Sequence, residues 1–337
     1  MAQVRWGILG TASIAESIAE GIRLSSNSVL RAIASRELSR ARAWAERFNV
    51  PRAFGSYEDL IGSGEVDAVY IPLPNSLHAE WTIRAMEAGL PVLCEKPLTA
   101  NAAEAREVLR ARDRTGLHVA EAFMYRFHPL YPRLLECLRS GAIDEVISVQ
   151  STFTFFLDDR NSIVASTELA GGALLDVGCY PVNLARLVAG CEPVRAAAMM
   201  RGRAVDDTLI GMLEFPNGML AQVECGIECF ERARAEIAGT QGSIVIESPW
   251  NPGDERAEFI LRREGRCETI STPGANRFQL EIEDFANAVL TGSSPRWPIE
   301  DAVHNMAALD ALIASARTGA VVSISSDPCV LCSSPRT

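Results

Sequence analysis

The sequence predicts an α/β protein in which a doubly wound parallel sheet is followed by a domain with a largely antiparallel sheet that carries helices. Three observations support this fold class. With 337 residues, the chain is long enough for two domains. Its first 120 or so residues alternate short apolar runs with segments of helical period. After about residue 125, apolar and polar residues alternate with a period of two.

In the first part of the chain, predicted strands and helices alternate. Asn101 and Ser39 are predicted N-caps or first-turn residues, and Gly89 and Gly116 mark helix ends. Such alternation indicates parallel strands that are connected by crossover helices. The predicted strands are 4–9, 29–34, 66–71, 91–94 and 117–122, and the predicted helices are 13–24, 38–48, 77–88 and 101–115.

The second part begins with a strand at 146–157 that has one apolar and one polar side, which is typical of an antiparallel sheet with one covered face. The apolar side holds Ile147, Val149, Phe153, Phe155 and Leu157, and the polar side holds Ser148, Gln150, Thr152 and Thr154. Further strands are predicted near 194–201, 206–215, 218–228, 233–239 and 243–247, with a turn at 216–218 and helices near 277–291 and 301–317. The predicted divisions are therefore 1–124, 125–322 and a disordered tail at 323–337.

The composition argues against several classes of partner. A net charge of −11 without a basic stripe makes a nucleic acid unexpected, and no uninterrupted apolar run is long enough to span a membrane. Nine cysteines, several in apolar segments, indicate reduced thiols and a cytoplasmic protein. Cys329 and Cys332 form a lone CxxC pair in a Ser/Pro-rich stretch, so we expect no metal site.

The turn after the first predicted strand resembles a dinucleotide fingerprint. Gly10, Ala12 and Ala15 supply the small residues for a tight turn, for close approach of a pyrophosphate and for helix packing. An ordinary strand–helix turn can show the same residues, but the position at the start of the first helix favours a phosphate. The predicted cofactor contacts in this turn are Gly10, Thr11, Ala12, Ser13 and Ile14.

The end of the second predicted strand distinguishes between cofactors. It carries Ser35 and Arg36, followed by Arg40, and no acidic residue at the strand's tip. A carboxylate there would bind the ribose 2′-hydroxyl, whereas arginine accommodates a 2′-phosphate. NADP is therefore favoured over NAD, although NAD remains possible. A solvated helix start is the alternative, and it is the favoured one for Arg40.

Two further loops follow predicted strands at the edge where ligands bind to open α/β sheets. The first loop places Leu73, Pro74, Asn75 and His78 as cofactor contacts, with a structural loop histidine as the alternative. The second, VLCEKPL at 92–98, carries Lys96. Lys96 is either the residue at which a strand meets water or a catalytic group that handles a proton.

Five motifs occur in order: GILGTASIA, PLPNSLHAEW, CEKPL, EAFMYRFHP and GGALLDVGCYP. Together they resemble the glucose–fructose oxidoreductase/inositol dehydrogenase (Gfo/Idh/MocA) family, and within it the NADP-dependent xylose and dihydrodiol dehydrogenases and 3-ketosugar reductases. The resemblance covers residues 4 to about 320 and implies a Rossmann domain followed by an open, mostly antiparallel sheet. It implies that Lys96 contacts both the nicotinamide ribose and the substrate. Tyr180 stands where inositol dehydrogenases have histidine, which favours tyrosine as the acid/base.

The residues around Tyr180 fit this chemistry. Asp176, Tyr180 and Asn183 share one face of a regular helix, although Pro181 weakens that geometry. A free tyrosine has a pKa of about 10, and the neighbouring positive charges of Lys96 and the oxidised nicotinamide would favour its phenolate form. Lys96 is therefore more consistent with catalysis than with a solvated strand end.

The sequence predicts an NAD(P)-dependent oxidoreductase that acts on a sugar, ketosugar or polyol. An NAD-dependent glycosidase and a non-catalytic NADP-binding regulator are the alternatives. The polar side of the strand at 146–157 suits a subunit contact, and family members often dimerise through the open sheet, so we expect a homodimer or a higher homo-oligomer. Further pocket candidates, each with a structural role as the alternative, are His128 and Asp159. The predicted catalytic residues are Lys96, Tyr180 and Asp176, which also contact the substrate. Further predicted substrate contacts are Tyr125, Phe155 and Asn183. Further predicted cofactor contacts are Glu95, Lys96 and Arg126.

Overall fold

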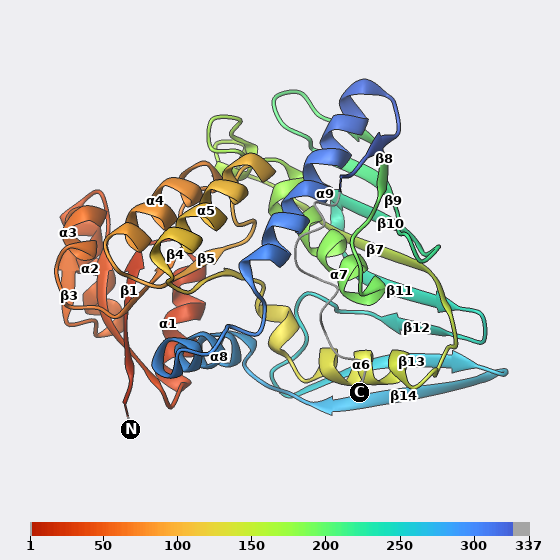
Figure 1. Cartoon of the computed structure of the whole chain (residues 1–337), viewed down its shortest axis with the longest axis horizontal. Helices are drawn as coiled ribbons and strands as arrows, with labels where there is room; N and C mark the ends of the chain where they lie inside the picture. Colours follow the sequence, from red (N-terminus) through yellow and green to blue (C-terminus); the bar gives the residue numbers. More distant parts are fainter. Residues whose placement is uncertain (1, 326–337) are drawn as a thin grey trace. The chain divides into compact units, whose positions relative to one another are not determined.

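The computed structural model describes residues 2–325, which divide into two compact units (Figure 1). Unit 1 holds residues 2–128 and Ala275–Val303, and unit 2 holds Pro129–Gly274 and residues 304–325. The segment Ala275–Val303, which the sequence assigned to the second domain, thus belongs to the first unit. From residue 326 onward the predicted tail, with its CxxC pair, lies outside the described residues.

Unit 1 is built on a six-stranded parallel sheet with the strand order β3-β2-β1-β4-β5-β6. The chain runs outward from β1 on both sides, so the topological switch point lies between β1 and β4. The strands are β1 Val4–Leu9, β2 Ser28–Ala34, β3 Arg52–Phe54, β4 Ala68–Ile71, β5 Val92–Glu95 and β6 Val119–Ala122. The crossover helices are α1 Ile14–Leu24, α2 Leu38–Phe48, α3 Tyr57–Ile61, α4 Asn75–Glu87 and α5 Ala102–Thr115. The predicted doubly wound arrangement is confirmed.

The helix α8 (Arg277–Thr291) belongs to unit 1 because it packs against α1 and β1. Gly21 of α1 allows the close approach, since a Cβ atom there would lie 2.9 Å from the Phe278 carbonyl carbon. The Trp6 and Phe285 rings lie 5.7 Å apart, and Asn27 donates a hydrogen bond to the Glu283 carbonyl. These contacts join residues more than 250 positions apart, which local sequence patterns do not reveal.

Unit 2 is built on a nine-stranded sheet with the order β14-β13-β12-β11-β7-β10-β9-β8-β15. Only the β7–β10 pair is parallel among the described strands of this sheet. The strands are β7 Val146–Phe156, β8 Arg195–Arg201, β9 Thr208–Glu214, β10 Leu220–Gly226, β11 Glu228–Gly239, β12 Ser243–Ile246, β13 Arg256–Arg263, β14 Arg266–Pro273 and β15 Val322–Ser323. The predicted, mostly antiparallel sheet is confirmed, while β13, β14 and β15 were not predicted.

The remaining elements of the chain are helical. They are α6 Leu130–Arg139, α7 Cys179–Ala189 and α9 Ile299–Thr318, with the short 3-10 helices η1 Met124–Phe127 and η2 Ile163–Ala165 and the π-helix η3 Leu174–Gly178. The helix α7 packs on β7 and β10, and Figure 1 shows it lying along one face of the sheet. No helix within residues 2–325 has the length and apolar character to cross a membrane.

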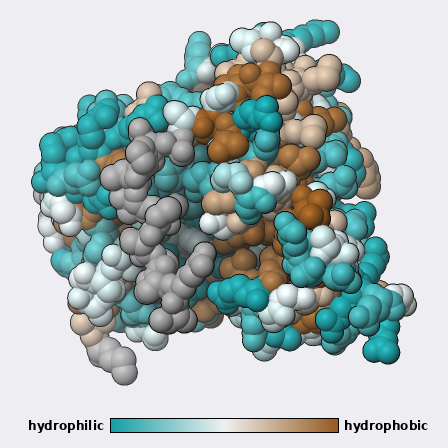
Figure 2. All heavy atoms as spheres, turned by 45° about the vertical axis from the view of Figure 1, so that its right-hand side comes forward, coloured by the Kyte–Doolittle hydropathy of each residue, from teal (hydrophilic) through white to brown (hydrophobic). Residues whose placement is uncertain are grey.

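The two faces of β7 differ as its alternation predicts. Val149 and Ser151 are buried, whereas Gln150 is exposed and donates to Gln222 on β10. Two residues depart from the prediction: the Ile147 side chain is 47% exposed, and Thr154, predicted on the polar side, is fully buried and donates to the Phe230 carbonyl. In Figure 2, hydrophobic side chains gather on part of the face shown, among hydrophilic ones. The exposed large apolar residues of β8 and β9 are Met199, Met200, Ile210 and Met212.

Candidate functional site

The predicted cofactor contacts of unit 1 gather at one edge of its sheet. The four loops that hold most of them follow β1, β2, β4 and β5, and parallel strands end at the same edge. This is the edge at which open α/β sheets bind ligands, next to the switch point between β1 and β4.

The loop after β1 has the backbone that a phosphate needs. Gly10 has a φ of 118°, and a Cβ atom there would lie 3.0 Å from the Leu73 side chain. Its amide donates to the Ala34 carbonyl at 2.9 Å, which fixes the turn. Ala15 is fully buried, whereas Thr11 and Ala12 are half-buried and Ser13 is exposed. The Ser13 side chain does not cap α1, so this turn can receive a pyrophosphate at the helix start.

Beyond β2, two arginines carry charge that the described residues do not neutralise. Arg36 and Arg40 are exposed, and neither side chain has a hydrogen bond or ion pair within residues 2–325. Burial raises the pKa of Tyr57, and the charges of these two arginines oppose that rise, so both guanidinium groups lie near its ring. Ser35 is buried, and its hydroxyl accepts from the Glu37 amide at 3.4 Å. Ser35, Arg36 and Arg40 together could therefore bind an anionic group such as a phosphate.

The loop that carries Lys96 is held by side chains from three other elements. The Leu98 amide donates to Glu121 at 2.7 Å, and the His78 Nδ1 atom lies 2.8 Å from the Pro97 carbonyl oxygen. Glu95 accepts from the Lys96 amide at 3.2 Å and from the Tyr70 hydroxyl. The Lys96–Pro97 peptide is cis. These bonds fix the backbone of the loop, and Lys96 itself is half-buried.

His78 lies inside unit 1, where its ring contacts backbone carbonyl groups. It is fully buried, and its two ring nitrogens lie 2.8 and 2.7 Å from the carbonyl oxygens of Pro97 and Leu73. Burial, together with the Lys96 charge, lowers the pKa of His78 to about 4. The neutral ring has one N–H group, so it donates to one of these two carbonyl oxygens and packs between the loop after β4 and the loop of Lys96. Pro74 and Asn75 are half-buried at the start of α4.

Arg126 and Tyr125 lie in η1, at the end of the first segment of unit 1. The Arg126 guanidinium lies 2.5 Å from Asp301 and between the rings of Phe123 and Trp297, with centroid distances of 5.3 and 4.2 Å. Its side chain is 2% exposed, which leaves little surface for a cofactor. Tyr125 is also buried, as is His128.

In unit 2, the predicted catalytic face does not lie on one regular α-helix. Asp176 belongs to the π-helix η3, and α7 begins only at Cys179, so the spacing of Asp176 and Tyr180 is not an α-helical turn. The start of η3 is fixed by Asp206, whose carboxylate accepts from the Leu174 amide at 2.7 Å. Burial raises the pKa of Asp206 to about 6. Gly172 leaves room for this carboxylate, because a Cβ atom there would lie 2.1 Å from it.

Tyr180 lies in an aromatic cluster that the sequence did not reveal. Its ring centroid lies 5.5 Å from that of Phe153 and 5.7 Å from that of Trp250. Trp250 is fully buried and donates from its indole nitrogen to the Thr152 carbonyl. The only local signal was a tryptophan in the loop SPWNPG after β12. These apolar walls keep water from most of the tyrosine ring, which is 5% exposed.

The other predicted site residues of unit 2 lie on different elements. Asn183 is buried on α7, and Phe155 is half-buried on β7. Asp159 accepts from the Asn161 amide at 2.9 Å and shapes the turn after β7. All seven cysteines within residues 2–325 are free thiols.

Comparison with known proteins identifies both parts of the chain. Residues 4–123 match the model for the oxidoreductase family with an NAD-binding Rossmann fold, and residues 131–245 match the GFO/IDH/MocA C-terminal domain. A D-xylose 1-dehydrogenase (NADP(+)) from Haloferax volcanii is 41% identical over 325 residues, which cover 95% of this chain and 99% of the relative. A dTDP-3,4-didehydro-2,6-dideoxy-α-D-glucose 3-reductase from Actinomadura kijaniata is 33% identical, with coverage of 94% and 96%.

The fold comparison agrees with this result. A crystal structure of a 3-ketoreductase from Actinomadura kijaniata, in complex with NADP and TDP-benzene, superposes with a TM-score of 0.89 at 32% identity and covers 93% of this chain and 98% of that one. Structures of the same reductase include one variant with a lysine replaced by alanine and one with a tyrosine replaced by phenylalanine. The chain therefore belongs to the Gfo/Idh/MocA family of oxidoreductases.

Proposed function

We propose that this protein is an NADP-dependent oxidoreductase that transfers a hydride between the nicotinamide and a carbon of a sugar, ketosugar or polyol. The observation that carries the cofactor choice is Arg36, which follows Ser35 at the end of β2 and has no ion pair within residues 2–325. Arginine at this place accommodates a 2′-phosphate. The relatives named as an NADP(+)-dependent xylose dehydrogenase and a ketosugar 3-reductase support the same cofactor and substrate class.

The residues of the chain then have to hold the cofactor and move one proton. Gly10 to Ile14 would receive the pyrophosphate, Ser35 and Arg36 the 2′-phosphate, and Lys96 the nicotinamide ribose. When bound, the nicotinamide supplies or accepts the hydride.

Tyr180 and Lys96 are proposed as the proton-handling pair. In the reductive direction the Tyr180 hydroxyl donates its proton to the carbonyl oxygen of the substrate, and in the oxidative direction its phenolate accepts the hydroxyl proton. The Lys96 ammonium group would stabilise the phenolate by its charge. In the related ketoreductase, structures were solved with one lysine and one tyrosine replaced, which supports the choice of a lysine and a tyrosine as the residues to test here. Asp176, through a water molecule, is the alternative proton carrier.

We also propose a homodimer, or a higher homo-oligomer, that uses the uncovered face of the sheet in unit 2. This face is polar where Gln150 pairs with Gln222, and apolar on β8 and β9. A groove of about 680 Å³ on it is lined by Met199, Ile210, Met212 and Val321, among others. The free thiols support a cytoplasmic location.

The cofactor assignment is tested by titrating NADP and NAD. We expect NADP to bind more tightly by at least about tenfold, because a charge-assisted bond to the 2′-phosphate contributes roughly 1.5–3 kcal/mol. Arg36→Ala should reduce this preference. Arg42→Ala, which replaces an exposed arginine on the following helix α2, should not. Equal affinities in the unmutated protein would overturn the assignment. Absorbance of the reduced nicotinamide with a panel of aldoses, polyols and dihydrodiols tests the substrate class.

A further inference from the structure

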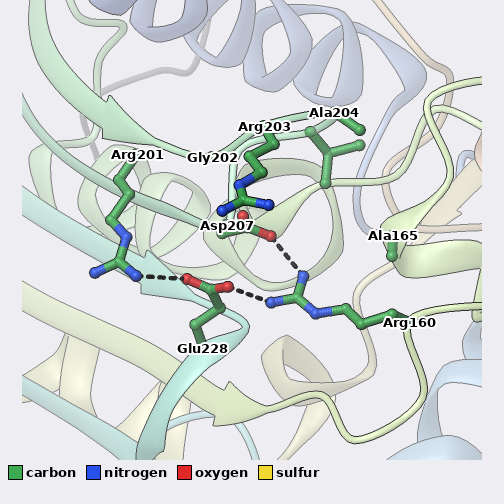
Figure 3. Close-up of a pocket in the computed structure, with 9 residues that line it drawn as sticks. Arg160, Ala165, Arg201, Gly202, Arg203, Ala204, Asp207 and Glu228 are labelled. Carbon is green, nitrogen blue, oxygen red and sulfur yellow. Dashed lines mark hydrogen bonds and ion pairs between the residues drawn. The ribbon is translucent and has the colours of Figure 1, made fainter.

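A second polar site lies in unit 2, at the edge of the sheet where β8 ends and β11 begins (Figure 3). It is a hollow of about 700 Å³ that is lined by three separate segments of the chain. The loop after β7 contributes Arg160, the β8–β9 connection contributes Arg201 to Asp207, and β11 contributes Glu228. Figure 3 shows Arg160 joined to Asp207 and Glu228, and Arg201 joined to Glu228, while no line joins Arg203 to either carboxylate.

The charges in this hollow do not balance. Arg160 pairs with Asp207 at 2.6 Å and also with Glu228, and Arg201 pairs with Glu228 at 3.2 Å. Arg203 is exposed and has no hydrogen bond or ion pair within the described residues. Three guanidinium groups therefore face two carboxylates, which leaves one positive charge.

The backbone beneath these side chains is tightly defined. The Asp207 amide donates to the Arg201 carbonyl at 2.8 Å, and the Asp207 carbonyl accepts from the Ile227 amide at 2.8 Å. Gly202 permits the tight return of the connection, because a Cβ atom there would lie 1.9 Å from the Val205 carbonyl oxygen. The turn thus holds Arg201 and Arg203 on the rim of one hollow.

We propose that this hollow binds a phosphate group, with Arg203 as its principal contact. Guanidinium groups bind phosphate through two parallel hydrogen bonds, and Arg203 has all its donors available. Arg201 is 81% exposed, and an exposed ion pair contributes only about 0–1 kcal/mol, so Arg201 can turn toward a ligand at low cost. Arg160 stays paired with the buried Asp207 and adds its charge to the hollow. A phosphate would neutralise the surplus charge that the protein leaves there.

We attribute this phosphate to the substrate, because the hollow and the helical segment that carries Tyr180 are both tied to one connection, between β8 and β9. Asp207 holds Arg160 in the hollow, while the adjacent Asp206 holds the Leu174 amide at the start of the helical segment that carries Asp176 and Tyr180. Both sites are thus fixed by neighbouring residues at one edge of the sheet. This second step rests on the proposed function, and it names a phosphate ester of a sugar as the substrate class.

Calorimetry with inorganic phosphate and phenyl phosphate tests the binding step independently of turnover. The protein is first saturated with NADP, so that the phosphate positions of the cofactor site are filled. We expect saturable binding that Arg203→Gln weakens by roughly 10- to 150-fold, the loss of one charge-assisted contact. Arg195→Gln is the control, because Arg195 lies on β8, the strand before the connection that carries Arg203, and pairs with Glu214 outside the hollow. No saturable binding, or equal binding in Arg203→Gln, would overturn the site.

Kinetics distinguish a substrate phosphate from free phosphate that acts as an effector. If the substrate carries the phosphate, Arg203→Gln should raise KM for a sugar phosphate, leave KM for the matching neutral sugar unchanged, and abolish competition by inorganic phosphate. Phosphate binding without any effect on KM for sugar phosphates would overturn the substrate step. Absence of turnover with all sugars would contradict the proposed function, and calorimetry would still decide whether the hollow binds phosphate.

Discussion

At the residue scale, the setting of Lys96 separates a catalytic lysine from an ordinary strand end. A solvated lysine needs no fixed backbone, yet Glu95, Glu121 and His78 all bond to the loop around Lys96. Three side chains that constrain one short loop are expected where a group must be positioned for chemistry. The setting of Tyr180 is comparable, because Phe153 and Trp250 enclose its ring.

If these two residues act together, their substitutions should not be additive. Tyr180→Phe should retain the fold and NADP affinity but lower turnover by about 100- to 10,000-fold, the usual contribution of a general acid or base. Lys96→Met should cost at least as much, and the double variant should be little worse than the poorer single one. Steady-state kinetics and the pH profile of oxidation measure both effects, and the basic limb should disappear in Tyr180→Phe. Full activity of Tyr180→Phe would leave the tyrosine as a pocket wall.

The buried His78 makes stability depend on pH in a defined window. Its pKa is lowered from 6.5 to about 4 in the folded protein, so the unfolded chain binds a proton first as the pH falls. The free energy of unfolding should therefore decrease by about 3 kcal/mol between pH 6.5 and 4 from this group.

Chemical denaturation across this range tests the effect. His78→Gln should be less stable at pH 7, because buried carbonyl groups lose a donor, and its stability should change less on acidification. His118→Gln, a substitution of a half-buried histidine in the same unit, is the control. A parallel pH dependence of the His78→Gln variant and the unmutated protein would contradict this account.

At the element scale, the π-helix η3 depends on two contacts that the Asp206 carboxylate makes at its start. Gly172 has a φ of 117° and lies against the Asp206 carboxylate, which caps the Leu174 amide. The motif GGALLDVGCYP predicted a functional helix with Asp176 and Tyr180, and the structure confirms a helical segment there. It could not predict the π turn, because Asp206 comes from the distant β8–β9 connection.

Gly172→Ala should therefore destabilise the protein more than the replacement of another positive-φ glycine that has no neighbour near its Cβ position. The new methyl group would meet the Asp206 carboxylate, so we expect a loss of roughly 2–4 kcal/mol in the free energy of unfolding and a lower turnover. Gly190→Ala is the matched control: Gly190 ends α7 with a φ of 64°, and nothing lies near its absent Cβ atom, so its cost should be roughly 1–2 kcal/mol. Equal costs in urea denaturation would rule out the steric argument.

At the scale of the whole molecule, the sequence predicted what depends on periodicity and missed what depends on distant contacts. The strands β1, β2, β4, β5 and β6 were predicted because each is a short apolar run. The short β3 and α3 lack such a run, and β14 is exposed along most of its length. The alternation of β13, which buries Ala257, Phe259 and Leu261, was overlooked. The assignment of α8 to unit 1 depends on Gly21 and Trp6, far away in the chain. The same holds for the Trp250 wall beside Tyr180.

The uncovered sheet face of unit 2 leads to a prediction about assembly. Met199, Ile210 and Met212 are 82%, 48% and 51% exposed on adjacent strands, and contiguous exposed apolar side chains favour a protein–protein contact. The pairing of Gln150 with Gln222 beside them supplies the polar part of such a contact. We therefore expect a homodimer at micromolar concentration by light scattering.

Met212→Glu should convert this dimer into a monomer, because each copy would have to bury a carboxylate in an apolar contact without a partner. The side chain is half exposed, so the fold and the binding of NADP by unit 1 should persist, which circular dichroism and cofactor titration can verify. Leu24→Glu is the control, since Leu24 is 40% exposed on α1 of unit 1 and is not part of this sheet. A monomeric unmutated protein, or a Met212→Glu variant that stays dimeric, would show that this face does not join two copies of the chain.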